Sequence, residues 1–198
     1  MPPSFSAVLL AAGHSTRMGR DKALLEIDRV PLWQHQRATL VHAGAAEIFL
    51  SARPDQAWTP TAAPHFAAVV HDRFPNCGPL AGITAALERA AHPHLAVLAI
   101  DLPRIDAGWF ATLRTACAPG VGAVGRRGEF FEPLAAIYPR ELMPFARAAL
   151  ARGELSLQRL LAVAVAQRLL LVHEITPAEA ARFENWNEQV FAPQKPKP

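Results

Sequence analysis

The chain has 198 residues, of which 51% are hydrophobic and 19% charged, and its formal net charge is +3. This length suits one compact domain, and this composition excludes a disordered chain. Three of the 20 basic residues are lysines, and because Lys195 and Lys197 fall in the last four residues, the positive charge does not predict a nucleic-acid or membrane partner. We expect one domain over residues 1–191 and a disordered Pro- and Lys-rich tail over 192–198.

Short apolar runs alternate with helical patterns along the chain, which is typical of a mostly parallel sheet covered by helices. The expected strands are 6–10, 47–51, 67–71, 95–100, 121–125, 132–138 and 168–172. The expected helices are 31–43, 79–91, 106–117, 140–151, 156–164 and 176–183, with a glycine-containing loop up to residue 25 and a turn at 126–128. We predict a single α/β domain with a Rossmann-like, mostly parallel sheet and helices on both faces.

The N-terminal segment and the cysteines do not indicate export or a metal centre. The first apolar run has no basic flank and is too short for a signal peptide or a membrane span. Cys77 and Cys117 lack the spacing of a zinc site or a disulfide framework, which favours two reduced thiols. We expect a cytoplasmic protein, with its eight scattered histidines at the surface or in loops.

The loop after the first strand has the composition of a nucleotide-binding loop. It contains Gly13, Arg17, Gly19 and Lys22, and small residues at a strand end let backbone N–H groups approach a phosphate. Its spacing differs from a Walker A loop and from the dinucleotide fingerprint. Lys22 stands in a chain that otherwise uses arginine, and lysine is a compact charge for phosphate oxygens. An ordinary strand-to-helix turn with surface cations is the alternative.

Later positions add a carboxylate, two glycines and two amides. Asp101 follows the most apolar strand, at the edge where open α/β sheets bind ligands, and a carboxylate there can hold Mg²⁺. Gly78 and Gly82 flank a helix start, where bare backbone can pack against a flat ligand such as a base. Asn185 and Asn187 would point both amides to one face of an extended segment. Caps and turns are the alternatives for all five residues.

Five segments resemble, in order, the motifs of the molybdenum cofactor guanylyltransferases, the MobA-like branch of the nucleotidyltransferase superfamily. They are LLAAGHSTRMGRDKALL at 9–25, PLWQH at 31–35, GPLAGI at 78–83, IDLP at 100–103 and FENWN at 183–187. The resemblance implies the fold of the nucleotide-diphospho-sugar transferases. It also implies Mg²⁺-dependent transfer of GMP from GTP to the phosphate of molybdopterin, with release of pyrophosphate.

The resemblance further implies roles for individual residues. Arg17 and Lys22 are expected to bind the triphosphate and Asp101 to bind Mg²⁺, so that these three carry catalysis. The implied nucleotide site comprises Leu10, Ala11, Ala12, Gly13, Lys22, Asp72, Gly78, Gly82 and Asp101. Asn185 and Asn187 are expected to contact the acceptor. A phosphate nucleophile is already anionic at neutral pH, so no general base is expected, and proteins that make or accept the cofactor are the expected partners.

Three positions depart from the pattern of that family. The first loop reads Leu-Ala-Ala-Gly at 10–13 where many guanylyltransferases have Leu-Ala-Gly-Gly, so Ala12 adds a methyl group near the guanine or ribose. Ser51-Ala52-Arg53 replaces an Asn-rich stretch, and we assign it no binding role. Glu188-Gln189 replaces the usual Thr-Pro.

Two other functions follow from these departures. Leu-Ala-Ala-Gly is common in cytidylyltransferases, which makes a CTP-using transferase the alternative enzyme, although those relatives usually have aspartates at positions 185 and 187. A catalytically idle nucleotide-binding module is the alternative from another class. The presence of Arg17, Lys22 and Asp101 argues against it, because a module without turnover need not keep all three.

Overall fold

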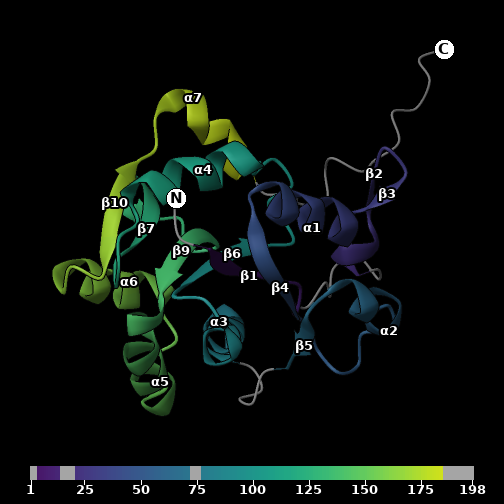
Figure 1. Cartoon of the computed structure of the whole chain (residues 1–198), viewed down its shortest axis with the longest axis horizontal. Coiled ribbons are helices and arrows are strands. Elements are labelled where there is room, and N and C mark those ends of the chain that lie inside the picture. Colours follow the sequence, from purple (N-terminus) through teal and green to yellow (C-terminus); the bar gives the residue numbers. More distant parts are fainter. Residues whose placement is uncertain (1–3, 14–20, 72–76, 185–198) are drawn as a thin grey trace.

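The computed structural model describes residues 4–13, 21–71 and 77–184, and one sheet runs through its centre (Figure 1). The strands follow one another in the order β10-β7-β9-β6-β1-β4-β5, and β8 pairs with β7. Their bounds are Phe5–Leu10 (β1), Ala45–Ser51 (β4), Ala68–Val70 (β5), His94–Ala99 (β6), Gly122–Arg127 (β7), Phe130–Phe131 (β8), Ala135–Pro139 (β9) and Leu170–Glu174 (β10). All pairings of this sheet are parallel except those of β8 and β9, which confirms the predicted architecture.

Helices cover both faces of the sheet, as predicted (Figure 1). They are α1 (Leu32–His42), α2 (Thr59–Ala62), α3 (Gly78–Arg89), α4 (Ala107–Ala116), α5 (Met143–Ala151), α6 (Leu157–Ala166) and α7 (Pro177–Ala180). One hydrophobic cluster includes Trp33 of α1 and Phe110 of α4, and a second includes Leu80 of α3 and Leu161 of α6. The chain therefore folds as a sheet with a separate apolar core on each side.

Side-chain caps and prolines set several helix ends. Asp106 accepts a hydrogen bond from the backbone N–H of Trp109 at the start of α4, and Ser156 accepts one from Arg159 at the start of α6. Gly78 opens α3 with a φ of +62°, followed by Pro79 in the first turn, where a missing N–H costs no hydrogen bond.

The predicted elements differ from the observed ones in several places, and β8 is one strand that we did not predict. The segment predicted as loop up to residue 25 contains a short 3-10 helix at Lys22–Leu24, and a hairpin of β2 (Glu26–Ile27) and β3 (Val30–Pro31) follows where we predicted no strand. The helix α2 is an element for which we predicted none. The predicted turn at 126–128 was wrong for its first two residues, because Arg126 and Arg127 pair with β8 and the chain reverses after them.

One histidine contradicts the expectation of surface positions. His94 is buried in β6, where its Nε2 lies 3.1 Å and 3.0 Å from the carbonyl oxygens of Ala118 and Val121. Two carbonyl acceptors require this nitrogen to carry the proton, so the ring is held by the backbone of the neighbouring turn.

Cys77 and Cys117 are both unpaired, and burial raises the pKa of the Cys117 thiol to about 11. No helix in the described part of the chain is long and apolar enough to cross a bilayer. The predicted tail at 192–198 lies outside the described residues and stays a prediction.

Candidate nucleotide-binding site

A cavity of about 770 Å³ opens where the carboxyl ends of β1, β4 and β6 meet. These strands are parallel, so the residues that follow them come together at one edge of the sheet. Eight of the residues predicted for the nucleotide site line this cavity: Leu10, Ala11, Ala12, Gly13, Lys22, Gly78, Gly82 and Asp101. The other four predicted site residues, Arg17, Asp72, Asn185 and Asn187, lie outside the described residues, and their roles stay predictions.

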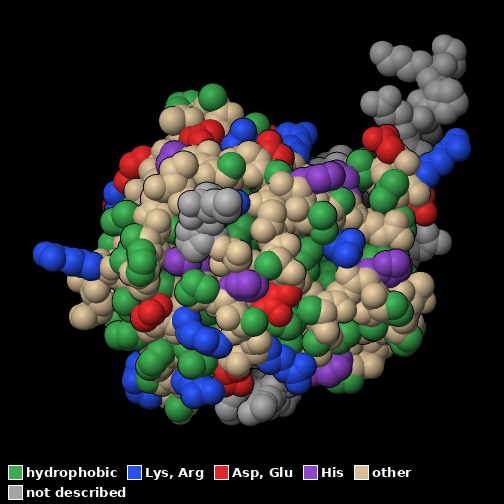
Figure 2. Space-filling model, in the orientation of Figure 1, with side chains coloured by type: hydrophobic (Ala, Val, Ile, Leu, Met, Phe, Trp, Pro, Cys, Tyr) green, Lys and Arg blue, Asp and Glu red, His purple; other side chains and the backbone are tan. Residues whose placement is uncertain are grey.

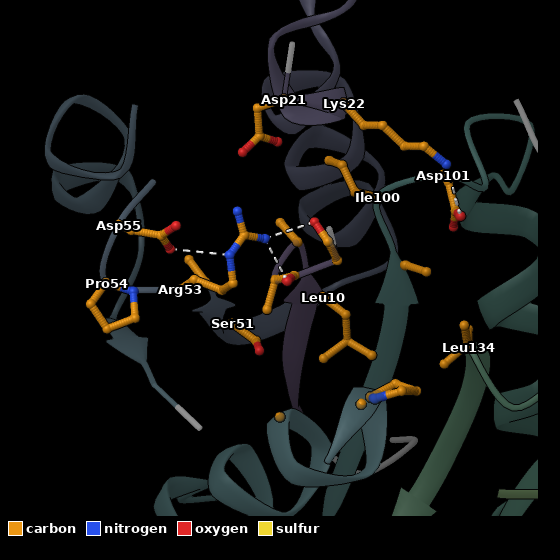
Figure 3. A pocket seen from close by; sticks show the side chains of 18 residues that line it. Leu10, Asp21, Lys22, Ser51, Arg53, Pro54, Asp55, Ile100, Asp101 and Leu134 are labelled. Carbon is orange, nitrogen blue, oxygen red and sulfur yellow. Dashed lines mark hydrogen bonds and ion pairs between the residues drawn. The ribbon is translucent and has the colours of Figure 1, made fainter. Parts of the chain in front are cut away.

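The charged end of the cavity holds Lys22 and Asp101. The Lys22 Nζ lies 3.7 Å from a carboxylate oxygen of Asp101, and the side chains are 25% and 31% exposed (Figure 3). An ammonium group and a carboxylate at a half-open strand edge suit phosphate oxygens and a hard cation, respectively. No cluster of three or more His, Cys, Asp or Glu side chains in the described ranges could hold a metal ion.

Asp21 also lines the cavity, but its carboxylate is engaged within the protein. One oxygen accepts hydrogen bonds from Gln56 Nε2 and from the indole Nε1 of Trp58, the latter at 2.8 Å. The other oxygen accepts a hydrogen bond from the backbone N–H of Ala23. Asp21 thereby caps the short helix that starts at Lys22. Its role is to fix the backbone that carries the lysine.

The segment after β4 holds the loop after β1 in place. Nη1 of Arg53 donates to the carbonyl oxygens of Ala12 and Gly13 at 2.7 Å and 2.8 Å, and Nε2 of buried Gln56 donates to that of Ala11 at 2.9 Å. From the sequence we assigned residues 51–53 no binding role. A usable indication was their position directly after a parallel strand, because such positions share the edge with Gly13 and Asp101.

The apolar end of the cavity is built where α3 approaches β1 and β4. A Cβ on Gly82 would stand 2.5 Å from Ser51 Oγ and 3.2 Å from Leu10 Cδ2. The protein's own packing therefore already favours glycine at this position, before any ligand is considered. At Gly78 a Cβ would meet nothing within 4 Å, so there the positive φ is what favours glycine.

Figure 3 shows how these parts are arranged around one space. Lys22 and Asp101 lie together on one side, Arg53 reaches the loop from the other, and Leu10 and Ser51 stand between the loop and the start of α3. A charged end and an apolar slot in one cavity fit a ligand with anionic groups at one end and a flat ring at the other.

Comparisons with known proteins show what the chain is similar to. The MobA-like NTP transferase domain family matches residues 7–170. A probable molybdenum cofactor guanylyltransferase of Opitutus terrae is 43% identical over 187 residues, which cover 93% of this chain and 91% of that protein. A molybdenum cofactor guanylyltransferase of Pseudomonas fluorescens is 37% identical, with 78% of each chain covered.

Solved structures of lower identity share the fold. Molybdopterin-guanine dinucleotide biosynthesis protein A from Archaeoglobus fulgidus superposes with a TM-score of 0.70 at 19% identity, covering 93% of each chain. The 2-C-methyl-D-erythritol 4-phosphate cytidylyltransferase from Thermus thermophilus superposes with a TM-score of 0.67 at 18% identity, and the superposition covers 94% of each chain. A sheet of this kind thus occurs in proteins named for different nucleotides, and fold alone does not select one.

Proposed function

The chain belongs to the family of MobA-like NTP transferases, and from this premise we propose that it is a molybdenum cofactor guanylyltransferase. It transfers GMP from GTP to the phosphate of molybdopterin and releases pyrophosphate. The observation that carries the proposal is the single cavity that brings Lys22, Asp101 and the glycine loop together. The names of the relatives, one of them 43% identical, support guanine as the base and molybdopterin as the acceptor.

The donor nucleotide is bound by the two ends of the cavity. The ammonium group of Lys22 contacts the triphosphate, and backbone N–H groups of the loop around Gly13 donate to its oxygens. The ring lies in the apolar part of the cavity lined by Leu10 and the start of α3, where Gly78 presents no side chain. This orientation brings the α-phosphorus toward Asp101.

Asp101 fits the requirements of a Mg²⁺ ligand. Its carboxylate is partly exposed at the cavity wall, and the 3.7 Å ion pair with Lys22 leaves its oxygens able to accept further bonds. Mg²⁺ is commonly held by one or two carboxylates together with substrate phosphates, and Asp101 can supply such a carboxylate. When bound, the ion neutralises charge on the phosphate oxygens.

The reaction needs position and charge more than proton transfer. A phosphate oxygen of the acceptor attacks the α-phosphorus of GTP, a new P–O bond forms, and the bond to the bridging oxygen breaks to release pyrophosphate. The attacking oxygen is already anionic, so no side chain has to remove a proton from it. Lys22 stabilises the charge that develops on the pyrophosphate as it leaves, and the loop holds the donor in line.

Asn185 and Asn187 complete the proposal on the acceptor side, and Arg17 and Asp72 complete it on the donor side, as implied by the family's motifs. We place the reaction in the cytoplasm, with other proteins of cofactor biosynthesis or cofactor-dependent enzymes as partners. Neither a nucleic acid nor a membrane takes part in the proposed reaction.

The test is a comparison of four nucleotides. The protein is incubated with Mg²⁺, molybdopterin and GTP, CTP, ATP or UTP, and pyrophosphate is measured with and without the acceptor. We expect acceptor-dependent release with GTP. Release of pyrophosphate with CTP alone would favour a cytidylyltransferase, the alternative suggested by Ala12. No release with any nucleotide would favour the idle nucleotide-binding module.

A further inference from the structure

Arg53 connects the segment after β4 to the glycine loop after β1. Its Nη1 donates to two successive carbonyl oxygens, those of Ala12 at 2.7 Å and Gly13 at 2.8 Å. Its Nε donates to Asp55 at 3.1 Å, which fixes the plane of the guanidinium. The side chain is 23% exposed and lines the cavity. The Arg53 side chain therefore links the end of β4 to the loop after β1 along one wall of the cavity.

These contacts set the direction of the loop's peptide groups. In a planar trans peptide the N–H points opposite to the C=O of the preceding residue. Because the Ala12 carbonyl points to Arg53, the N–H of Gly13 points away from it, and among the described residues that N–H has no hydrogen-bond partner. An unpaired N–H in a glycine loop is the kind of donor that binds a phosphate oxygen.

The third nitrogen of the guanidinium, Nη2, is available to bind a ligand. Nη1 and Nε are engaged by the loop and by Asp55, whereas Nη2 bonds to no residue in ranges 4–13, 21–71 and 77–184. Arginine is permanently charged and its donors form a rigid planar fork, so it can hold both carbonyls and still offer Nη2 to an anion. A lysine at this position would retain the charge but lose the fork.

We propose that Arg53 is a positioning residue for the phosphates of the donor nucleotide. It holds the carbonyl groups of Ala12 and Gly13 away from the phosphates and thereby presents the N–H of Gly13 to them. Without it, the Ala12–Gly13 peptide can turn over, and a carbonyl oxygen then faces the anionic ligand. The inference rests on the proposed function for the identity of the ligand, but the same geometry binds any polyphosphate.

The experiment separates phosphate recognition from general stability by using three ligands. Affinities for GTP, inorganic triphosphate and guanosine are measured by calorimetry for the wild type, Arg53→Ala and Arg53→Lys. The matched control is Arg126→Ala, which removes an exposed arginine from β7. For both Arg53 variants we expect affinity for GTP and for triphosphate to fall roughly 10- to 100-fold, as for a lost charge-assisted hydrogen bond, and affinity for guanosine to stay unchanged. In turnover assays the KM for GTP rises more than kcat falls.

Three results would overturn the inference. Unchanged triphosphate affinity in Arg53→Ala would show that the loop does not need the residue. Wild-type affinity in Arg53→Lys would show that charge alone suffices and that the fork is irrelevant. An equal loss of guanosine and triphosphate binding would indicate a general structural role. If the wild type binds triphosphate but transfers no GMP, the proposed function fails and Arg53 is still tested by the triphosphate measurements.

Discussion

The two halves of the carboxyl edge of the sheet use polar groups in different ways. Around β1 and β4, side chains such as Arg53 and buried Gln56 donate to backbone carbonyls of the glycine loop. Around β7 and β10, ion pairs between exposed side chains, such as Arg126 with Glu174, stand beside side chain-to-backbone contacts such as those of Gln158 with Phe131. Over the face drawn in Figure 2, basic and acidic side chains are likewise interspersed.

This difference shows where the geometry of the site is determined. A side chain bonded to the backbone within the protein holds one conformation, because losing the bond leaves a buried polar atom unsatisfied. An exposed ion pair is screened by water and salt and contributes little. We therefore expect substitutions of the side chains that hold the glycine loop to change function or stability, and substitutions of the exposed ion-paired side chains around β7 and β10 to change neither.

The largest effect is expected at the charged end of the cavity. Asp101→Asn and Lys22→Ala each remove a charge that acts on the phosphates in the transition state, so we expect kcat/KM to fall by at least about 100-fold. The urea unfolding midpoint should stay near that of the wild type, because both side chains are partly exposed. Pyrophosphate release measures the activity. Near-normal turnover in either variant would remove that residue from the mechanism.

The next effect concerns the contact between α3 and β4. In Gly82→Ala the new Cβ would stand 2.5 Å from Ser51 Oγ, which is too close for two unbonded atoms. We expect this substitution to lower the free energy of unfolding by about 1–3 kcal/mol. The double variant Ser51→Ala, Gly82→Ala removes that oxygen and should recover part of the loss. Urea denaturation of the four proteins in the cycle measures the coupling. Strictly additive losses would show that the two residues do not press on each other.

A smaller effect is expected at the cap of the lysine-bearing helix. Trp58→Phe removes the indole N–H that donates to Asp21 and keeps an aromatic ring beside Trp33. Asp21 still accepts from Gln56, so we expect a loss of about 1 kcal/mol in unfolding free energy. Chemical denaturation measures it, with Phe66→Leu as a control that changes the same aromatic cluster without touching Asp21. No loss beyond that of the control would mean that the indole bond is unimportant.

The smallest effect is expected for the exposed pair on the other half of the edge. A hydrogen bond from Arg126 lowers the pKa of the Glu174 carboxyl. A carboxyl whose pKa is lower in the folded than in the unfolded protein stabilises the fold at pH values above the unfolded-state pKa. This contribution is lost as the pH falls through the pKa of the folded state. Because the pair is exposed, Glu174→Gln should leave the urea midpoint at neutral pH unchanged. NMR titration should show the low pKa of Glu174, and a large stability loss would contradict the contrast between the halves.

The sequence allowed the main architecture to be predicted because its strands are short, apolar and separated by clear helix starts. The runs leading to Leu10, Ser51 and Ile100 indicated three strands that end at one edge, and Pro79 indicated the helix that follows. Parallel order then brought Gly13, Asp101 and the start of α3 together. For this part of the site, local pattern and topology were sufficient.

Other features could not be predicted because the chain carries no local indication of them. The β2–β3 hairpin turns at Asp28 and Arg29 with φ values of +50° and +67°, where the usual turn residues are Asn and Gly. The role of Arg53 depends on carbonyl groups about 40 positions away in the chain. His94 is buried because a distant turn supplies two acceptors for its ring. Each of these features depends on contacts that form only in the folded chain.

The most direct test of the proposed reaction follows labelled phosphorus from GTP. The protein is incubated with Mg²⁺, molybdopterin and GTP labelled at either the α- or the γ-phosphorus, and the products are separated. We predict that the α-label enters the molybdopterin product and that the γ-label is recovered in pyrophosphate. Transfer of the γ-label to the acceptor, or transfer of neither label, would contradict a guanylyltransferase.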